Sequence, residues 1–331
     1  MADNKGVLVV GDINEGKLAA ITAEMLGAGK KLATKLGEPL CAALLGSGVK
    51  GLAAEAIAFG ADKVFVVDDA NLKDYQSDAY VTAAESVIKQ ANPRIVLLGQ
   101  STVGRDLAPR LAFRFNTSIS MDCVDLDVDA NKLLVQTKPV YGGNARAIFT
   151  TEALPQMATV RPKAMTALPR DAAKTGEVVD VASGIDPAKI KTKFVKKIKE
   201  EVAGVKLEDA PAVIAGGRGI GGPDGFKQLE ELARLFKGAV GATRPAVDNN
   251  WVPATIQVGL TGKIVAPELY IAIALSGSSQ HMAGCSGSKT IVAINKDPES
   301  NIFREARYGI VGDWKQALPA FTAKVKELLK E

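Results

Sequence analysis

The chain has 331 residues, of which 47% are hydrophobic and 24% charged, and its formal net charge is only +4. This length favours two domains, and the composition is typical of a globular protein, which excludes the disordered and fibrous classes. No apolar run approaches the roughly 20 residues that cross a bilayer, so we expect no membrane-embedded segment.

The N-terminal stretch MADNKGVLVVGDINEGK leads directly into an apolar run. It is typical of neither a signal peptide nor an Arg-rich transit peptide. Cys41, Cys123 and Cys285 lie far apart, and no CxxC pair or second histidine is present to complete a zinc site. We therefore expect reduced thiols, no metal, and a cytoplasmic location in a bacterium, or the mitochondrial matrix for a processed eukaryotic chain.

The first half of the chain alternates strand-like and helix-like segments. Helix-length segments at 17–36 and 75–91 separate short apolar runs that predict strands at 6–10, 40–46, 63–69 and 94–99. Strands joined by helices of this length are typical of a parallel sheet covered on both faces. Past residue 116 the pattern changes to alternating, turn-punctuated strands, which predict a β-rich extension that closes an N-terminal α/β domain over 1–187.

The segment 188–206 holds seven lysines and two acids, so it carries the whole excess of positive charge. Its lysines alternate with Ile190, Phe194 and Ile198, which is typical of a lysine-protected edge strand at a domain junction. A nucleic-acid-binding protein would instead spread basic residues over a face, beside aromatic residues or a recognition helix. We therefore expect no nucleic-acid partner.

The second half begins again with a strand, a glycine-rich turn and an amphipathic helix in PAVIAGGRGIGGPDGFKQLEELARLF. Gly217, Gly219 and Gly222 satisfy G-x-G-x-x-G, the spacing of dinucleotide-binding turns. An NAD site also requires an acid about 20 residues further on, at the end of the next strand. Thr243 and Arg244 stand there instead, which argues against an NAD-dependent dehydrogenase.

Polar residues follow each predicted strand of this half. They are Arg218, Arg244, the loop from Ser276 to His281, Asn295 and Asp313. Because parallel strands end at the same edge of a sheet, these residues are expected to line one crevice. The sequence therefore predicts a nucleotide site within 207–331.

The stretch GKIVAPELYIAIALSGSSQHMAGCSGSKTIVAINKDPESNIFREARYGIVGDW closely resembles the signature region of the electron-transfer flavoprotein alpha (large) subunit. GGRGIGG, GATRPAVD, QVGLTGK, GRDLAPRLAFRF and TKPVYGGNARA are similar to the same family, so the resemblance covers nearly the whole chain. It implies two α/β domains, of which the first docks a smaller beta subunit and the second, at 207–331, holds FAD in a parallel-sheet fold. Such heterodimers carry electrons in fatty acid β-oxidation, from acyl-CoA dehydrogenases or other flavin dehydrogenases to a membrane quinone oxidoreductase, and have no substrate of their own.

The resemblance also assigns roles to individual residues. His281, the only histidine, would donate to the N1 and C2-carbonyl end of the flavin, and Arg244 would pack over the isoalloxazine. Thr261 would bond the flavin N5, and the adenosine end would lie by Asn295 and Asp313. The implied FAD contacts are Arg218, Thr243, Arg244, Val258, Gly259, Leu260, Thr261, Ser276, Gly277, Ser278, Ser279, Gln280, His281, Asn295, Asp313 and Trp314.

Other interpretations remain open for several of these features. Asp313 is also placed to cap a helix that begins at Trp314, and Cys285 suits a small buried position. Leu260 stands where the family often has glutamine, which removes one polar contact near the ring. A flavin-based bifurcating complex that oxidises NADH is the alternative within the family. Outside it, the alternatives are the NAD-dependent dehydrogenase and a colourless nucleotide-binding regulator.

Overall fold

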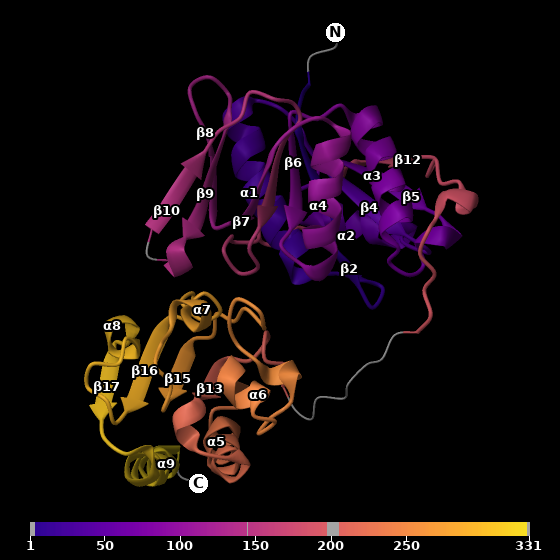
Figure 1. Cartoon of the computed structure of the whole chain (residues 1–331). Helices are drawn as coiled ribbons and strands as arrows, with labels where there is room; N and C mark the ends of the chain where they lie inside the picture. Colours follow the sequence, from indigo (N-terminus) through magenta and orange to yellow (C-terminus); the bar gives the residue numbers. More distant parts are fainter. Residues whose placement is uncertain (1–3, 144, 197–204, 330–331) are drawn as a thin grey trace. The chain divides into compact units, whose positions relative to one another are not determined.

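The structure, a computed structural model, describes residues 4–143, 145–196 and 205–329. The chain divides into two compact units, Met1–Val140 with Arg146–Lys197, and Tyr141–Ala145 with Ile198–Glu331 (Figure 1). Within the described residues, no helix has both the length and the apolar character needed to cross a membrane.

The first unit is built on a parallel sheet, as the sequence predicts. Its seven strands lie in the order β12 (Glu177–Asp180), β5 (Lys63–Asp68), β4 (Leu40–Gly46), β1 (Val7–Val10), β6 (Ile95–Gly99), β11 (Gln156–Val160) and β7 (Ile119–Cys123). All neighbouring strands pair in parallel. Every residue of β1, β6 and β11 is buried, because helices cover both faces of the sheet.

Alternate residues of β1 enter two separate cores. Val7 and Val9 belong to the core beneath one pair of helices, α1 (Ala20–Leu36) and α2 (Ala53–Ala58). Leu8 and Val10 belong to the core beneath α3 (Ser77–Ala91) and α4 (Thr102–Arg114). This is the two-residue period of a strand, and it explains why the apolar run is continuous.

The β-rich extension is present, but its strands divide between two sheets. β7 and β11 lengthen the parallel sheet, whereas β8 (Asp125–Val128), β9 (Leu134–Val140) and β10 (Ala145–Phe149) form a separate three-stranded sheet. β8 and β9 pair in antiparallel fashion. A short hairpin of β2 (Ile13–Asn14) and β3 (Lys17–Leu18) follows β1.

The predicted edge strand at 188–206 is wrong for its described part. Residues 187–189 form a 3₁₀ turn and 190–196 form no strand, while 197–204 lie outside the described residues. The strand that pairs with β5 at this end of the sheet is β12, which precedes the segment in the chain. Ile190 packs on the core beneath α3 and α4, and Phe194 is 41% exposed.

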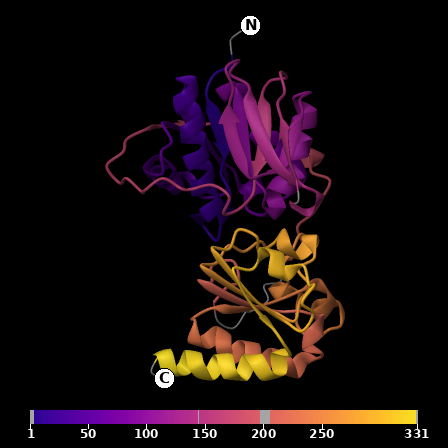
Figure 2. The same cartoon turned by 90° about the vertical axis from the view of Figure 1, so that its left-hand side faces the viewer.

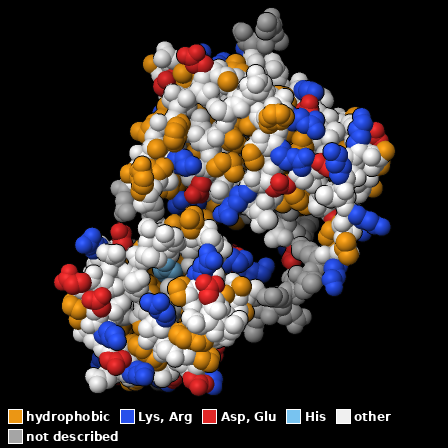
Figure 3. Space-filling model, in the orientation of Figure 1, with side chains coloured by type: hydrophobic (Ala, Val, Ile, Leu, Met, Phe, Trp, Pro, Cys, Tyr) orange, Lys and Arg blue, Asp and Glu red, His pale blue; other side chains and the backbone are white. Residues whose placement is uncertain are grey.

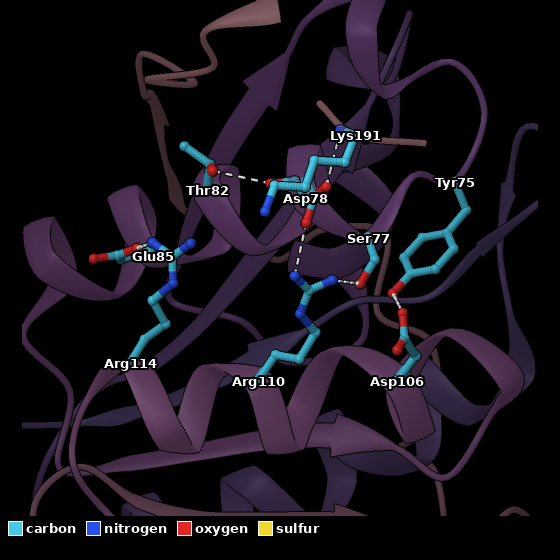
Figure 4. Close-up of polar contacts among 9 residues, drawn as sticks. All are labelled: Tyr75, Ser77, Asp78, Thr82, Glu85, Asp106, Arg110, Arg114 and Lys191. Atoms are coloured by element: carbon cyan, nitrogen blue, oxygen red, sulfur yellow. Dashed lines mark hydrogen bonds and ion pairs between the residues drawn. The ribbon is translucent and has the colours of Figure 1, made fainter. Parts of the chain in front are cut away.

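Asp78 on α3 anchors the start of this segment. Its carboxylate accepts hydrogen bonds from the backbone N–H of Lys191 at 3.1 Å and from Arg110 of α4 at 2.7 Å (Figure 4). These bonds, the Arg110 guanidinium first, lower the pKa of Asp78. Arg114 pairs with Glu85 across the same two helices at 2.7 Å. Partly exposed ion pairs of this kind contribute about 0–1 kcal/mol each, so they orient α3 against α4 but add little to the stability of the domain.

The second unit has its own parallel sheet. The strand order is β14 (Ala239–Ala242), β13 (Ala212–Gly216), β15 (Leu269–Ile273), β16 (Thr290–Asn295) and β17 (Tyr308–Val311). The longer helices are α5 (Pro223–Leu235) and α9 (Trp314–Leu329), and the shorter ones are α6 (Arg244–Asp248), α7 (Ser279–Met282) and α8 (Ile302–Glu305). α5 and α9 lie together on one face of the sheet (Figure 2). This unit confirms the predicted second α/β domain.

The chain leaves β13 for β14 on one side and returns to β15 on the other. Open parallel sheets bind ligands at the carboxyl ends of the strands where the order reverses in this way. The predicted site residues follow these strand ends, as described next.

Candidate nucleotide-binding site

The backbone after β13 packs directly on the backbone after β15. The N–H of Gly219 donates to the carbonyl of Ala274 at 3.1 Å, and a side chain at Gly219 would place its Cβ 2.8 Å from the same oxygen. Ala274 itself has a φ of 51°, a left-handed conformation that is costly for a residue other than glycine. Such strain gathers at functional sites.

The third glycine of the G-x-G-x-x-G match, Gly222, does not pack closely against another part of the chain as Gly219 does. A side chain at Gly222 would meet nothing within 4 Å, whereas one at Gly225 would collide with Ile220. The close helix contact that the dinucleotide fingerprint requires of its last glycine is therefore made elsewhere. β14 ends at Ala242 and is followed by Thr243 and Arg244, so the ribose-binding acid is absent from this strand end.

A pocket of about 180 Å³ lies at the carboxyl edge of the sheet. Its lining residues are Gly219, Ala274, Asn295, Lys296, Asp313, Trp314 and Lys315. The structure thus brings together Asn295, Asp313 and Trp314, which were predicted, with two lysines that were not. Lys296 directly follows the end of β16, which was the available signal in the sequence.

Each predicted residue of this pocket also has a partner in the protein. The side-chain amide of Asn295 donates to the carbonyl of Leu275 at 2.8 Å. Asp313 accepts from the N–H of Lys315 at 2.9 Å, so it does cap α9, and Trp314 Nε1 donates to the carbonyl of Gly219 at 3.1 Å. These bonds fix the pocket's walls before any ligand arrives.

Thr243 carries the clearest indication of a ligand. Its side chain is 8% exposed, and the Oγ1 atom has no hydrogen-bond partner among the described residues. A buried hydroxyl without a partner costs about 1–3 kcal/mol, so such a group is normally bonded. Arg244 follows it with 64% of its side chain exposed, 3.4 Å from Asp248. Arg218 is also exposed.

The loop 258–263 lies against α7. The N–H of Leu260 donates to the carbonyl of Gln280 at 2.8 Å, and Gly259 has a φ of 143° that favours glycine. Leu260 is 52% exposed. The Thr261 hydroxyl accepts from Gln257 Nε2 at 2.9 Å, so its own hydrogen can still be donated to a ligand.

The loop after β15 presents Ser276, Ser278 and Gln280 at the surface, with Ser279 half-buried. Gly277 has a φ of 70°, and a Cβ there would lie 2.5 Å from the backbone nitrogen of Ile302. The tight approach to α8 therefore requires glycine at this position.

The structure places His281 in the interior of the second unit. Its side chain is 5% exposed, Nδ1 lies 3.1 Å from the carbonyl oxygen of Val258, and Nε2 lies 2.8 Å from the Tyr270 hydroxyl. Burial lowers the pKa of the imidazole to about 4, and the bond to Val258 offsets part of that shift. The ring is therefore neutral at pH 7, and both nitrogens already have partners within the domain.

The depressed pKa of His281 predicts an acid-sensitive second domain. The unfolded chain, with its pKa near 6.5, takes up a proton before the folded one does, so stability is complete above pH 6.5 and falls as the pH drops toward 4. The loss is up to about 1.4 kcal/mol per pH unit. Urea unfolding followed by tryptophan fluorescence measures it, because Trp251 and Trp314 both lie in this domain.

His281→Asn is the matched variant for that measurement, since its amide does not titrate. The difference in unfolding free energy between wild type and variant should change with pH between 6.5 and 4. Parallel curves would show that the imidazole is not buried in its neutral form.

The cysteines are buried or half-buried, and burial raises the pKa of their thiols to about 11 for Cys41 and about 12 for Cys123 and Cys285. In the part of the chain that the structure describes, no three His, Cys, Asp or Glu side chains form a group that could hold a metal ion. The donor set at the carboxyl edge is hydroxyls, amides, backbone N–H groups and cations. That set fits a phosphate-containing nucleotide.

Comparison with known proteins agrees with this geometry. Residues 7–185 match the family described as "Electron transfer flavoprotein domain", and residues 206–286 match "Electron transfer flavoprotein FAD-binding domain". The electron transfer flavoprotein subunit alpha of Thermoanaerobacterium thermosaccharolyticum is 44% identical over 329 residues, which is 99% of this chain and 100% of that protein.

Two further relatives cover the chain to a similar extent. The corresponding subunit of Megasphaera elsdenii is 43% identical over 99% of this chain and 98% of its own. The lactate dehydrogenase (NAD(+),ferredoxin) subunit LctC of Acetobacterium woodii is 36% identical over 97% of this chain and 77% of its own. The chain belongs to the electron transfer flavoprotein alpha-subunit family.

Proposed function

We propose that the second domain binds FAD at the carboxyl edge of its sheet. The unpartnered hydroxyl of Thr243 carries this proposal, because it is buried at the end of β14 and has a hydrogen to donate. Together with Arg218 and the loop Ser276–Gln280, Thr243 would hold the pyrophosphate and ribityl chain. The pocket formed by Asn295, Asp313 and Trp314 would take the adenosine end.

The exposed residues of loop 258–263 and Arg244 would face the isoalloxazine. Thr261 has a hydrogen available for flavin N5, and Val258 and Gly259 form the base of the loop. FAD supplies the redox chemistry, since it accepts and releases electrons one at a time. The protein's part is to bind and orient the ring and to set its potential through nearby charge.

The first domain is proposed to dock an electron transfer flavoprotein beta subunit. Hydrophobic side chains gather over the three-stranded sheet of this unit (Figure 3), among them Ile148 at 68% and Phe149 at 45% exposed on β10. Leu154, after that strand, is 40% exposed. Apolar surface of this kind is typical of a protein interface.

The heterodimer would carry electrons from flavin dehydrogenases of the acyl-CoA type to a membrane quinone oxidoreductase. A role in a bifurcating complex that oxidises NADH is the second candidate, and the similarity to the NAD(+)- and ferredoxin-linked lactate dehydrogenase subunit favours it.

A visible spectrum during stepwise dithionite reduction tests this function, with the chain co-expressed with its small subunit. Flavin absorbance that bleaches in two successive one-electron steps would support the electron carrier. A second flavin, or direct two-electron reduction by NADH, would favour the bifurcating complex. A colourless protein that takes up no FAD would refute both.

A further inference from the structure

The buried hydroxyl of Tyr270 and the imidazole of His281 form a pair whose geometry fixes where each hydrogen lies. The carbonyl oxygen of Val258 can only accept, so Nδ1 of His281 must carry a hydrogen to bond it at 3.1 Å. In the neutral ring Nε2 then has none, and the Tyr270 hydroxyl must donate to it at 2.8 Å. The pair therefore selects one of the two imidazole tautomers.

The Tyr270 hydroxyl has few acceptors to which it could donate its hydrogen. Tyr270 lies on β15 between β13 and β16 and is 0% exposed, and besides His281 its hydroxyl interacts with the thiol of Cys285. Sulfur is a weak acceptor, so the imidazole nitrogen is the better partner for the hydroxyl hydrogen. A buried tyrosine hydroxyl normally finds such a partner.

The tautomer matters because the hydrogen on Nδ1 makes the bond to the carbonyl of Val258. Val258 begins the loop 258–263, which is also bonded to the α7 region by the N–H of Leu260, which donates to the Gln280 carbonyl. If Nδ1 lost its hydrogen, two lone pairs would face each other across the Val258 contact. The loop would then lose the side-chain bond that holds its first residue, Val258.

We propose that Tyr270 is a positioning residue, which together with the Val258 carbonyl holds His281 in the Nδ1-protonated tautomer and so secures the start of the loop 258–263. The functional importance of this positioning rests on the proposed function, since the loop 258–263 is the one expected to face the flavin. Tyr270 itself touches no part of that surface.

The chain's single histidine makes the tautomer directly measurable. In the full chain labelled with [¹⁵N]histidine, long-range ¹H–¹⁵N spectra at pH 7 should show a protonated Nδ1 and an unprotonated Nε2. A protonated Nε2, or averaged shifts from both tautomers, would overturn the proposal without any variant and without any flavin.

Tyr270→Phe removes only the donor. We expect it to raise the population of the Nε2-protonated tautomer, which only the Val258 carbonyl then disfavours, and to speed amide hydrogen exchange in peptides spanning 258–263 at least tenfold. Tyr308→Phe is the matched control, because Tyr308 lies on β17 of the same sheet and is 60% exposed. Unchanged tautomer and exchange in Tyr270→Phe would overturn the proposal.

A double variant separates positioning from general destabilisation. His281→Asn keeps a donor for Val258 but has no Nε2 to fix, so adding Tyr270→Phe to it should speed loop exchange far less than tenfold. A full tenfold effect in that background would mean that Tyr270 only fills the core. Absence of FAD binding would refute the proposed function alone, because none of these readouts requires flavin.

Discussion

Arg244→Ala should lower the reduction potential of the bound flavin, on the order of 60 mV for a one-electron step, which corresponds to a tenfold change in the equilibrium. Arg244 opens α6 at the carboxyl edge of the sheet, and its guanidinium stays charged at every working pH. A cation beside the ring favours the forms that gain negative charge. Because 64% of the side chain is exposed, solvent screening keeps the effect moderate.

Two further variants sharpen this redox titration. Arg244→Lys keeps the charge but not the planar fork, so its potential should fall between those of wild type and Arg244→Ala. Asp248→Asn should shift the potential upward, since Asp248 lies 3.4 Å from Arg244 and offsets its charge. If Arg244→Lys matched Arg244→Ala, charge would not be the quantity that tunes the flavin.

Arg234→Ala is the control for a general charge effect. Arg234 lies in the last turn of α5, at the opposite edge of the sheet, because a helix that follows a strand runs back along it. Its loss should leave the potential unchanged. An equal shift in both alanine variants would show that net charge, and not the position of Arg244, is responsible.

If the second domain binds FAD as proposed, the charge beside the ring is expected to come from Arg244 and not from His281. With its pKa lowered to about 4, the imidazole carries no charge at pH 7, and its donor hydrogen is used by Val258. His281→Asn, which preserves that donor, should therefore change the potential far less than Arg244→Ala. The family resemblance places both residues beside the flavin ring.

Strands that are buried on both faces were the easiest elements to predict. The run at 6–10 has a matching strand at Val7–Val10 because each of its residues enters one core or the other. Helix α4 was not predicted from periodicity, since Pro109 and several charged residues interrupt its apolar pattern. The segment 188–206 has strand-like alternation, but pattern alone cannot reveal that β12 already occupies the edge.

The candidate site also has features that the sequence could predict and features that it could not. The convergence of Asn295 and Asp313 was predictable because parallel strands end at one edge, whatever their side chains do. The orientation of His281 was not, since its partners Tyr270 and Val258 lie 11 and 23 residues away in the chain. Contacts of that kind are set by packing, which a local pattern does not encode.

Thr243→Val should affect the flavin-free and flavin-bound proteins in opposite directions. Valine has the shape of threonine without the hydroxyl that is buried and unpartnered at the end of β14. Its removal should raise the unfolding free energy of the flavin-free protein by about 1 kcal/mol. The same change should weaken FAD binding about tenfold, or about 1.4 kcal/mol, because the hydroxyl's proposed partner is the cofactor.

Thr22→Val provides the comparison, since Thr22 is also buried but its hydroxyl is bonded. Its hydroxyl donates to the carbonyl of Asp12 at 2.9 Å and accepts from the N–H of Asp12 at 2.8 Å. Circular dichroism should show the first domain destabilised by about 1–2 kcal/mol, with the FAD dissociation constant unchanged. If Thr243→Val behaved like Thr22→Val, its hydroxyl would serve the fold. A variant that is more stable without flavin but binds FAD more weakly would support a hydroxyl whose partner is the ligand.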